Sequence, residues 1–326
     1  MILAGDIGGT KSNLGLFDVR NGAPVRAAHK RYSSHDHAGL HEIALDFLRE
    51  TGAKISAAGF GIAGPVLQNR VQASNIPWIV DGAEMAKFLG LPNVLLLNDL
   101  QATAYGVSLL GPADMEMIAP GTPVENATRA VIAAGTGLGQ SILYWDGAQY
   151  VALPSEAGHA DFAPNTDQQA DLWKFLKSKN DFVYQELILA GRGFQRVHEF
   201  LDPSVRHPGF DGQGVDPAVE ITELALAGKC PVCVATVNLW IEIYGSEAGN
   251  LALRVVARGG IYVAGGIAVK ILMKIKEGRF AAAAHRKSHA GGFALEDVPI
   301  HVILDEECPL KGAAYAAWKS SQEQVR

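Results

Sequence analysis

Short apolar runs and amphipathic segments alternate along the first third of the chain. An apolar run at residues 2–7 ends on two glycines, and further strand-like runs follow at residues 13–19 and 25–32. Between the last two runs lies Asn21-Gly22, a pair that tight hairpin turns favour. These runs predict a three-stranded meander. The predicted order continues with a helix from residue 40 to about Gly52, a strand at 57–62, a helix at 82–89, a strand at 94–97 and a helix through Ala104 and Val107.

The same pattern restarts near residue 130. A strand is predicted at residues 130–134, a glycine turn follows it, and two more strands are predicted at residues 141–145 and 150–153. Because each half opens with a strand, a glycine turn and two further strands, we expect two related α/β domains. The remaining predicted elements are a helical stretch over residues 167–259 interrupted near 203–217, strands at 261–264 and 300–304, and a closing helix at 310–318.

The domain boundary is expected in a segment rich in glycine and proline, at residues 110–123. We predict a small α/β domain over residues 1–110, joined by the C-terminal helix 309–326, and a large α/β domain over residues 111–308. Each domain is expected to contain a mixed sheet flanked by helices, with a cleft between the two domains. The length of 326 residues agrees with two domains of about 150 residues each.

Composition and charge exclude several classes of protein and partner. Hydrophobic residues make up 48% of the chain and charged residues 19%, which excludes disorder for most of it. The net charge is −6 without blocks of like charge, so neither nucleic acid nor an anionic membrane is expected as a partner. Three cysteines are too few for a disulfide framework, and no apolar run approaches the ~18 residues of a membrane span. We therefore expect a cytoplasmic protein.

Two glycine-rich turns after predicted strands have the character of phosphate-binding sites. The first is Asp6-Ile7-Gly8-Gly9-Thr10, whose glycines let backbone N–H groups approach a phosphate without obstruction by a Cβ atom. Thr10 adds a hydroxyl donor, and Asp6 can hold Mg²⁺ through water. A plain β-turn with an exposed acid is the alternative interpretation. The second turn is Gly135-Thr136-Gly137-Leu138-Gly139.

Neither turn is a familiar nucleotide-binding loop. A dinucleotide fingerprint needs a glycine at its sixth position and a helix after it, whereas Gln140 stands there and strand-like alternation follows. A P-loop needs a glycine before its lysine, and Thr10 precedes Lys11. Gly265-Gly266 after a third predicted strand adds another glycine pair. Two such turns facing each other across a cleft suit a polyphosphate.

Polar residues that suit a sugar accompany the turns. Asn98-Asp99 ends a buried strand where a helix begins, so that Asp99 can take a proton from an attacking hydroxyl and Asn98 can bond a sugar. A helix N-cap is the alternative for this pair. Glu156 and His159 frame a short glycine-containing loop and offer hydrogen-bond partners for adjacent hydroxyls, with a metal site as the alternative.

In this order, the motifs Asp6–Thr10, Asn98-Asp99, Gly135–Gly139, Glu156-Ala157-Gly158-His159 and Val263–Gly266 resemble those of bacterial glucokinases. These are the non-repressor type within the hexokinase/actin-like ATPase superfamily, and the resemblance covers nearly the whole chain. It implies two RNase H-like domains, phosphorylation of glucose at the 6-hydroxyl with ATP, Mg²⁺ as cofactor, and a homodimer. The usual glycine after the glutamate is Ala157 here.

The resemblance also implies roles for individual residues. Asp99 corresponds to the catalytic base, and Glu186 to a third hydroxyl-binding acid, although its helical context also fits a surface glutamate. The implied substrate-binding residues are Asn75, Asn98, Asp99, Glu156, His159 and Glu186. The implied nucleotide-binding residues are Gly5, Asp6, Ile7, Gly8, Gly9, Thr10, Gly135, Thr136, Gly137, Gly265 and Gly266.

Alternatives remain for the substrate and for some residues. A kinase for mannose, fructose or an N-acetylhexosamine would have nearly the same motifs, and an actin-like ATPase would share the phosphate turns without a sugar site. Cys230 and Cys233 form a lone Cys-x-x-Cys with no further ligands evident nearby, so we interpret them as small apolar residues at a helix end rather than zinc ligands. Trp240 and Tyr244 are expected in a helix core or a dimer surface.

Overall fold

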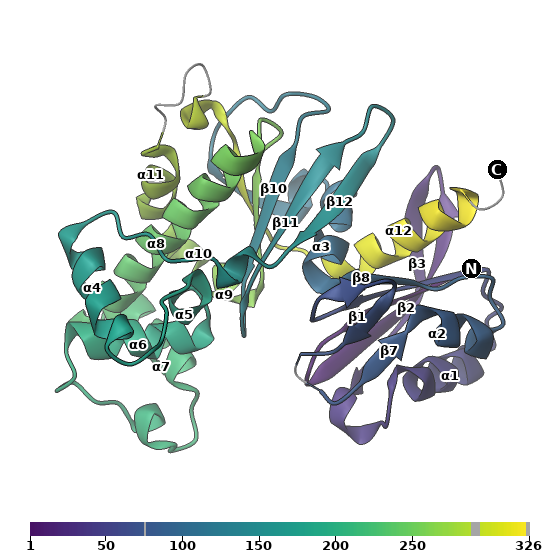
Figure 1. Cartoon of the computed structure of the whole chain (residues 1–326), viewed down its shortest axis with the longest axis horizontal. Helices are drawn as coiled ribbons and strands as arrows, with labels where there is room; N and C mark the ends of the chain where they lie inside the picture. The colour runs from purple at the N-terminus through teal and green to yellow at the C-terminus, as the bar shows by residue number, and fades with distance from the viewer. Residues whose placement is uncertain (75, 288–293, 324–326) are drawn as a thin grey trace. The chain divides into compact units, whose positions relative to one another are not determined.

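The computed structural model describes residues 1–74, 76–287 and 294–323 (Figure 1). Contacts between residues divide the chain into two units. The first unit comprises residues 1–114, residues 146–154 and the C-terminal segment from residue 305, and the second comprises residues 115–145 and 155–304. Residues 146–154 thus group with the first unit, although they lie inside the range 111–308 expected for the large domain.

Five strands form the main sheet of the first unit: β1 (Ile2–Ile7), β2 (Lys11–Arg20), β3 (Ala23–Ser33), β4 (Ala57–Ile62) and β8 (Leu95–Asn98). Their order is β3-β2-β1-β4-β8, with β1 antiparallel to β2 and parallel to β4. Asn21 and Gly22 have φ angles of 51° and 77°, the left-handed conformation that a tight hairpin turn requires. The predicted meander and hairpin turn are therefore confirmed.

The helices of the first unit are α1 (Leu40–Thr51), α2 (Gly82–Leu89), α3 (Asp99–Val107) and α12 (Cys308–Glu323), with short 3₁₀ turns η1 (Ser34–Asp36) and η2 (Pro112–Asp114). α1 ends on Gly52, whose φ of 62° suits a helix C-cap, as the sequence predicted. α2 begins after Asp81, whose carboxylate accepts from the N–H groups of Ala83 and Glu84.

The C-terminal helix α12 packs against α3, β1 and β4 of the first unit. Small residues make this close approach possible: a Cβ atom on Gly312 would overlap with the carbonyl oxygen of Ala102, and one on Gly106 with the carbonyl oxygen of Cys308. The side chain of Ala317 likewise lies where Gly59 has no Cβ atom. The last three residues of the predicted helix 309–326 lie outside the described residues.

A small antiparallel sheet in the first unit escaped prediction. It contains β5 (Val66–Leu67), β6 (Arg70–Gln72) and β7 (Ile79–Asp81), in the order β5-β6-β7. Strands of two or three residues contain too few positions for apolar–polar alternation to show. Only the pairing of β6 with both neighbours identifies them.

The sheet of the second unit repeats the connectivity of the first. β10 pairs antiparallel with β11 and parallel with β13, just as β1 pairs with β2 and β4. The order of the whole sheet is β12-β11-β10-β13-β14-β9, and its edge strand β12 consists mostly of residues that group with the first unit by their contacts. The repeat expected from the sequence is therefore present, but strand β9 lies in the segment 110–123 that we interpreted as a boundary. The strand bounds are β9 (Met115–Ala119), β10 (Arg129–Ala134), β11 (Leu138–Trp145), β12 (Tyr150–Ser155), β13 (Ile261–Ala264) and β14 (Ile300–Ile303).

Helices of the second unit pack around the long helix α8, drawn in green in Figure 1. No single helix among the described residues is long and apolar enough to cross a membrane; α7 and α8 pass that test only as a pair, by length and composition, with a bend of 102°. The helix bounds are α4 (Asp167–Lys177), α5 (Gln185–Ile188), α6 (Gly191–Leu201), α7 (Pro217–Leu226), α8 (Pro231–Val255), α9 (Gly266–Lys270), α10 (Leu272–Ile275) and α11 (Arg279–His285), with 3₁₀ turns η3 (Ala157–His159), η4 (Pro208–Asp211) and η5 (Leu295–Asp297).

Two aromatic residues of α8 lie in the core of the second unit. Trp240 and Tyr244 are fully buried, and Trp240 Nε1 donates to the carbonyl oxygen of Ile188 at 2.7 Å. The ring of Phe194 on α6 stacks on Trp240, with the ring centres 4.7 Å apart. Of the two expectations for this pair, the helix core is confirmed.

The interpretation of the cysteine pair as isolated from other ligand residues is wrong. His198 and His207 lie beside Cys230 and Cys233, and the ligand atoms of all four residues are within 4.8 Å of one another. The two histidines are 32 and 23 residues before Cys230 in the sequence (230 − 198 and 230 − 207), so only the folding of α6 and the following loop against α8 brings them there.

Gly312→Ala is expected to destabilise the first unit, although glycine-to-alanine changes inside helices ordinarily stabilise by ~0.5–1 kcal/mol. The added Cβ atom overlaps with the carbonyl oxygen of Ala102, so α12 must move away from α3, at ~1–3 kcal/mol. The shift of the urea-unfolding midpoint measures the effect. Ser320→Ala, at a half-exposed site on the same helix, is the control and is expected to change stability by less than ~0.5 kcal/mol. A Gly312→Ala protein as stable as the wild type would contradict the packing argument.

Candidate active site

The carboxylates of Asp6 and Asp99 lie close together in the first unit, at the edge of the sheet where the parallel strands β1 and β8 end. Asn13 Nδ2 donates to Asp6 Oδ2 at 3.2 Å, and Arg31 Nε donates to Asn13 Oδ1 at 2.9 Å. Burial raises the pKa of Asp6 to about 6; the bond from Asn13 opposes this shift, and the negative charge of Asp99 adds to it. A cation near Asp6 would relieve both the lost hydration and the repulsion between the carboxylates.

The side chains of two serines hold the turn after β1 in place. The N–H of Gly8 donates to the carbonyl oxygen of Lys11 at 3.0 Å, which closes the turn. Ser34 Oγ donates to the carbonyl oxygen of Gly8 at 2.8 Å, and the hydroxyl of Ser12 lies 2.9 Å from that of Ser34. Thr10 is exposed at the end of the turn. The turn is thus held in one shape with its outer side open.

Gly5 and Ile7, two of the implied nucleotide-binding residues, do not lie on the open side of this turn. Both are buried inside β1, paired with β2 and β4. The ring of Phe60 lies only 2.5 Å from where a Cβ atom on Gly5 would be. These two residues support the turn from within the sheet and do not form its exposed side.

Asn98 and Asp99 combine the two interpretations that the sequence left open. Asn98 is the N-cap of α3, because its Oδ1 accepts from the N–H of Leu100 at 2.9 Å, while its Nδ2 donates to the carbonyl oxygen of Gly64 at 3.1 Å. Asp99 is the first residue of the helix, and its Oδ1 also accepts from the N–H of Leu100 at 2.9 Å. The cap therefore fixes the orientation of the Asp99 carboxylate.

In the second unit, the turn Gly135–Gly139 is tied to Glu186 on α5. The N–H of Leu138 donates to Glu186 Oε2 at 2.8 Å, and a Cβ atom on Gly137 would lie 2.5 Å from the same oxygen. The N–H of Gly191 donates to the carbonyl oxygen of Gly135 at 2.9 Å. Glu186 is half-buried and bonded, so the surface glutamate that its helical context allowed is not what the structure shows.

The Glu156–His159 loop packs against the same turn. A Cβ atom on Gly158 would overlap with the carbonyl oxygen of Leu138, so only glycine fits at this position. Glu156 and His159 are exposed on either side of Gly158, and the His159 ring centre is 5.4 Å from that of Tyr184, two residues before Glu186. Three segments far apart in the sequence therefore meet at Leu138.

Gly265 and Gly266 lie beside the second glycine turn. β10 and β13 are parallel neighbours, with Ala133 opposite Ala264, so the residues that follow them are adjacent. Gly265 has a φ of 90°, and a Cβ atom on it would lie 2.5 Å from the carbonyl oxygen of Ala134, whereas Gly266 faces open space. Thr136 is exposed on the neighbouring turn.

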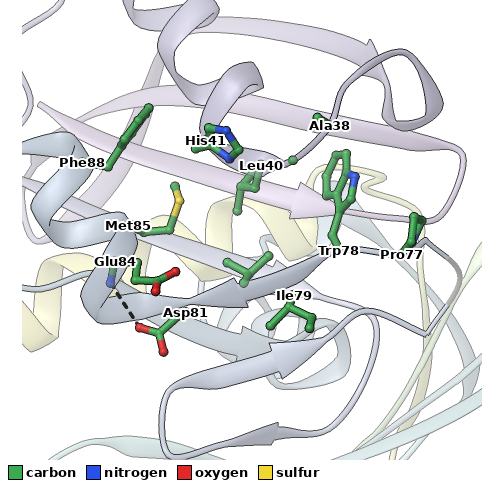
Figure 2. A pocket seen from close by; sticks show the side chains of 12 residues that line it. Ala38, Leu40, His41, Pro77, Trp78, Ile79, Asp81, Glu84, Met85 and Phe88 are labelled. Carbon is green, nitrogen blue, oxygen red and sulfur yellow. Dashed lines mark hydrogen bonds between the residues drawn. The ribbon is translucent and has the colours of Figure 1, made fainter.

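One predicted sugar contact and one pocket stand apart from these sites. Asn75 lies outside the described residues. A pocket of about 370 Å³ in the first unit is lined by residues 38–41, residues 77–81 and three residues of α2 (Figure 2). None of the residues that line it is a predicted site residue. The Asp81 carboxylate in it points to the start of α2, as its cap.

Comparison with known proteins decides the family. A family model described as Glucokinase matches residues 3–320. The chain belongs to the glucokinase family. A glucokinase from Nostoc punctiforme is 35% identical over 97% of this chain and 98% of its own length. The crystal structure of a glucokinase from an Antarctic psychrotroph superimposes with a TM-score of 0.85, at 28% identity and 98% coverage of both chains.

A more distant structure shows how widely the fold is shared. A repressor/open-reading-frame/kinase (ROK) family glucokinase from Streptomyces griseus, solved in complex with glucose and AMPPNP, has a TM-score of 0.67 at 21% identity, covering 98% of this chain and 99% of its own. This likeness concerns the fold alone. The predicted membership of the glucokinase family and the predicted α/β fold class, with mixed sheets flanked by helices, are confirmed.

Several residues that hold the candidate site residues in place are not predicted from the sequence pattern. Ser12 and Ser34 hold the first turn and Asn13 holds Asp6, but an isolated serine or asparagine in a strand or a 3₁₀ turn carries no visible signal. Gly158 carried a signal, since a glycine between a glutamate and a histidine suggests that another part of the chain comes close. What comes close, the carbonyl oxygen of Leu138, is known only from the fold.

Asp6→Asn is expected to stabilise this glucokinase-family protein at pH 8 but not at pH 4. Folding raises the pKa of Asp6 from 3.8 to about 6, so the ionised carboxylate is less stable in the folded chain than in the unfolded chain. This penalty is absent below about pH 4 and fully present above about pH 7, where its removal is worth ~1–3 kcal/mol. Asparagine remains uncharged and still accepts from Asn13. Thermal unfolding at both pH values measures the difference.

Asp18→Asn is the control for this change, because Asp18 is a half-exposed acid on the neighbouring strand β2. We expect it to alter stability by less than ~0.5 kcal/mol at either pH. Equal effects of Asp6→Asn at pH 4 and pH 8 would show that burial of charge at Asp6 is not the cause.

Proposed function

We propose that this protein transfers the γ-phosphoryl group of ATP to the 6-hydroxyl of glucose. Membership of the glucokinase family supports this reaction. The observation that carries it is the meeting of the glycine turn, the Glu156–His159 loop and Glu186 at Leu138. A glycine turn of the phosphate-binding type beside several hydrogen-bonding side chains fits a sugar kinase. An ATPase without a sugar substrate would need the turn but not the side chains.

Asp99 is the residue to which we assign the base. In an in-line transfer the 6-oxygen of glucose bonds to the γ-phosphorus, the bond from this phosphorus to the bridging oxygen of ADP breaks, and the hydroxyl proton passes to the carboxylate. The N–H of Leu100 fixes Asp99 Oδ1, so the carboxylate is oriented before the substrate arrives. Asn98 is largely committed to the cap and to Gly64, which makes it a weaker candidate for a sugar contact than Asp99.

The sugar hydroxyls are assigned to Glu156, His159 and Glu186 in the second unit. Glu156 and His159 are exposed on a loop whose position is fixed by Gly158. Glu186 has two functions in this proposal, because Oε2 holds the turn through Leu138 and Oε1 is the atom assigned to a hydroxyl. Asn75 is kept as a predicted sugar contact.

Phosphate binding is assigned to the two glycine turns, at Gly8-Gly9-Thr10 and Gly135-Thr136-Gly137. Gly265-Gly266 is assigned to the nucleotide because its open backbone adjoins the second turn. The carboxylate of Asp6 is assigned to Mg²⁺, through water, because this ion prefers oxygen ligands, and the raised pKa of Asp6 marks a position where a cation stabilises the ionised form. When bound, Mg²⁺ supplies positive charge to the phosphates.

A homodimer and a cytoplasmic location are further proposals. The first rests on the family resemblance, and the second on three cysteines that are all free in the structure. Light scattering coupled to size exclusion measures the mass of the assembly, and a monomer at micromolar concentration would contradict the dimer.

Asp99→Asn is expected to reduce kcat by at least ~10²-fold with little change in the affinity for glucose, because the shape is kept and the proton acceptor is lost. A coupled ADP-release assay gives kcat, and calorimetric titration gives the affinity. Asp81→Asn is the matched control, since Asp81 also stands at a helix start and asparagine caps equally well. It should leave kcat unchanged. A near-normal kcat for Asp99→Asn would remove Asp99 from the mechanism.

A panel of hexoses tests the choice of glucose. A site built to bond several hydroxyls disfavours an analogue that lacks one by up to ~10⁴-fold, because buried polar groups lose their partners. Glucose is expected to exceed mannose, fructose and its deoxy analogues in kcat/KM, and N-acetylglucosamine and N-acetylmannosamine are expected to be poorer still. A higher kcat/KM for fructose or an N-acetylated sugar would restrict the proposal to a hexose kinase of another specificity.

A further inference from the structure

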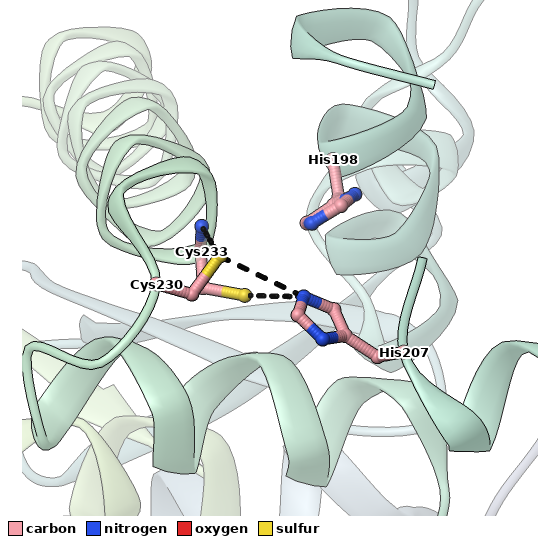
Figure 3. Close-up of side chains that lie close together, drawn as sticks. All are labelled: His198, His207, Cys230 and Cys233. Atoms are coloured by element: carbon pink, nitrogen blue, oxygen red, sulfur yellow. Dashed lines mark hydrogen bonds between the residues drawn. The ribbon is translucent and has the colours of Figure 1, made fainter. Parts of the chain in front are cut away.

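Four side chains of types that can bind a metal ion lie close together in the second unit (Figure 3). None of them is assigned a part in phosphoryl transfer. His198 is on α6, His207 directly precedes η4, Cys230 is the N-cap of α8, and Cys233 is in the first turn of that helix. One ligand atom from each side chain lies within 4.8 Å of the other three. His207 Nε2 is 3.2 Å from Cys233 Sγ and 3.7 Å from Cys230 Sγ.

These distances agree with a tetrahedral zinc site. Zinc binds thiolate sulfur at about 2.3 Å and imidazole nitrogen at about 2.0–2.1 Å, so tetrahedral angles place a sulfur and a nitrogen ligand about 3.6 Å apart. The two sulfur–nitrogen distances in the structure, 3.2 and 3.7 Å, lie on either side of this value. Two cysteines and two histidines are also a common ligand set of structural zinc sites.

His198 provides independent support, because it is a buried polar side chain without a partner. It is 0% exposed, and neither Nδ1 nor Nε2 has a hydrogen-bond partner. An unsatisfied buried donor or acceptor costs about 1–3 kcal/mol, so a histidine in this position needs a ligand. A bond from one ring nitrogen to a metal ion supplies it.

We propose that His198, His207, Cys230 and Cys233 bind one Zn²⁺ ion as a structural site. Four protein ligands complete the coordination and leave no open position for a substrate. Two thiolates neutralise the charge of the ion, which suits the buried surroundings. The ring of Phe210 covers the two histidines, with ring-centre distances of 5.0 Å to His198 and 5.4 Å to His207.

The start of α8 suits the thiolates. The N–H of Cys233 points at Cys230 Sγ, at a distance of 3.5 Å, and the positive end of a 25-residue helix stabilises negative charge on sulfur. A redox role for the pair fits less well, because Cys230 is only 8% exposed and Cys233 is fully buried, out of reach of a partner thiol. The ion would link α6, the loop before η4 and α8.

The first experiment is the metal content of the wild-type protein, purified without chelators or an affinity metal and measured by plasma mass spectrometry. We expect one zinc per chain. Cys233→Ser and His207→Ala are each expected to lower the zinc content at least ~10-fold. His207 is half-exposed, so its replacement is the milder test of folding. Cys308→Ser, at a buried cysteine of the first unit, is the matched control and should keep the zinc.

A second experiment needs no variant. Cobalt added to the reduced, chelator-treated wild-type protein should give the visible bands of tetrahedral cobalt and a thiolate charge-transfer band, and zinc should displace both. A zinc content far below one per chain together with no cobalt spectrum would overturn the proposal. Zinc that remains in Cys233→Ser and His207→Ala would also overturn it, because the metal would then be bound elsewhere. Both readouts are independent of kinase activity.

Discussion

The backbone of Leu138 is the point on which the candidate site of the second unit depends. Its N–H is bonded to Glu186, and its carbonyl oxygen lies where any side chain on residue 158 would be. Gly137 and Gly158 must therefore both lack a Cβ atom, the first to admit the carboxylate and the second to admit the carbonyl. The phosphate-type turn and the loop with Glu156 and His159 thus have one common support, and neither can shift without the other.

The first unit has the same sheet topology as the second, but it has a carboxylate beside its glycine turn. β1 and β10 each pair antiparallel with the next strand and parallel with a later one, so each has a glycine turn at the same edge. Of the two glycine turns, only the first has an acid, Asp6, two residues before its first glycine, and burial in the fold disfavours the charge of this acid. A group that destabilises the folded protein when ionised is typical of a site built for a ligand, and the cation proposed above would stabilise the ionised form of Asp6.

The sequence predicts features that depend on local pattern and misses those that depend on folding. The meander, the helix ending at Gly52 and the cap at Asn98 follow from periodicity and residue type, and the structure contains them. The strands β5 to β7 are too short to show a period, and β9 lies in a segment whose glycines and prolines suggested a linker. Likewise, the spacing of Glu156 and His159 around a glycine is visible in the sequence, whereas the contact of Glu186 with Leu138 requires two segments 48 residues apart to meet.

Helix α6 connects the two chemical features of the second unit. The N–H of Gly191, its first residue, bonds the carbonyl oxygen of the phosphate-type turn at Gly135, and His198 lies two turns further along the same helix. Between them, Phe194 stacks on Trp240 of α8, the helix whose N-cap is Cys230. An ion that joins α6 to the start of α8 would therefore hold the helix whose first residue supports the turn. The proposed metal would act on catalysis only through this helix, by fixing the turn at Gly135 in place.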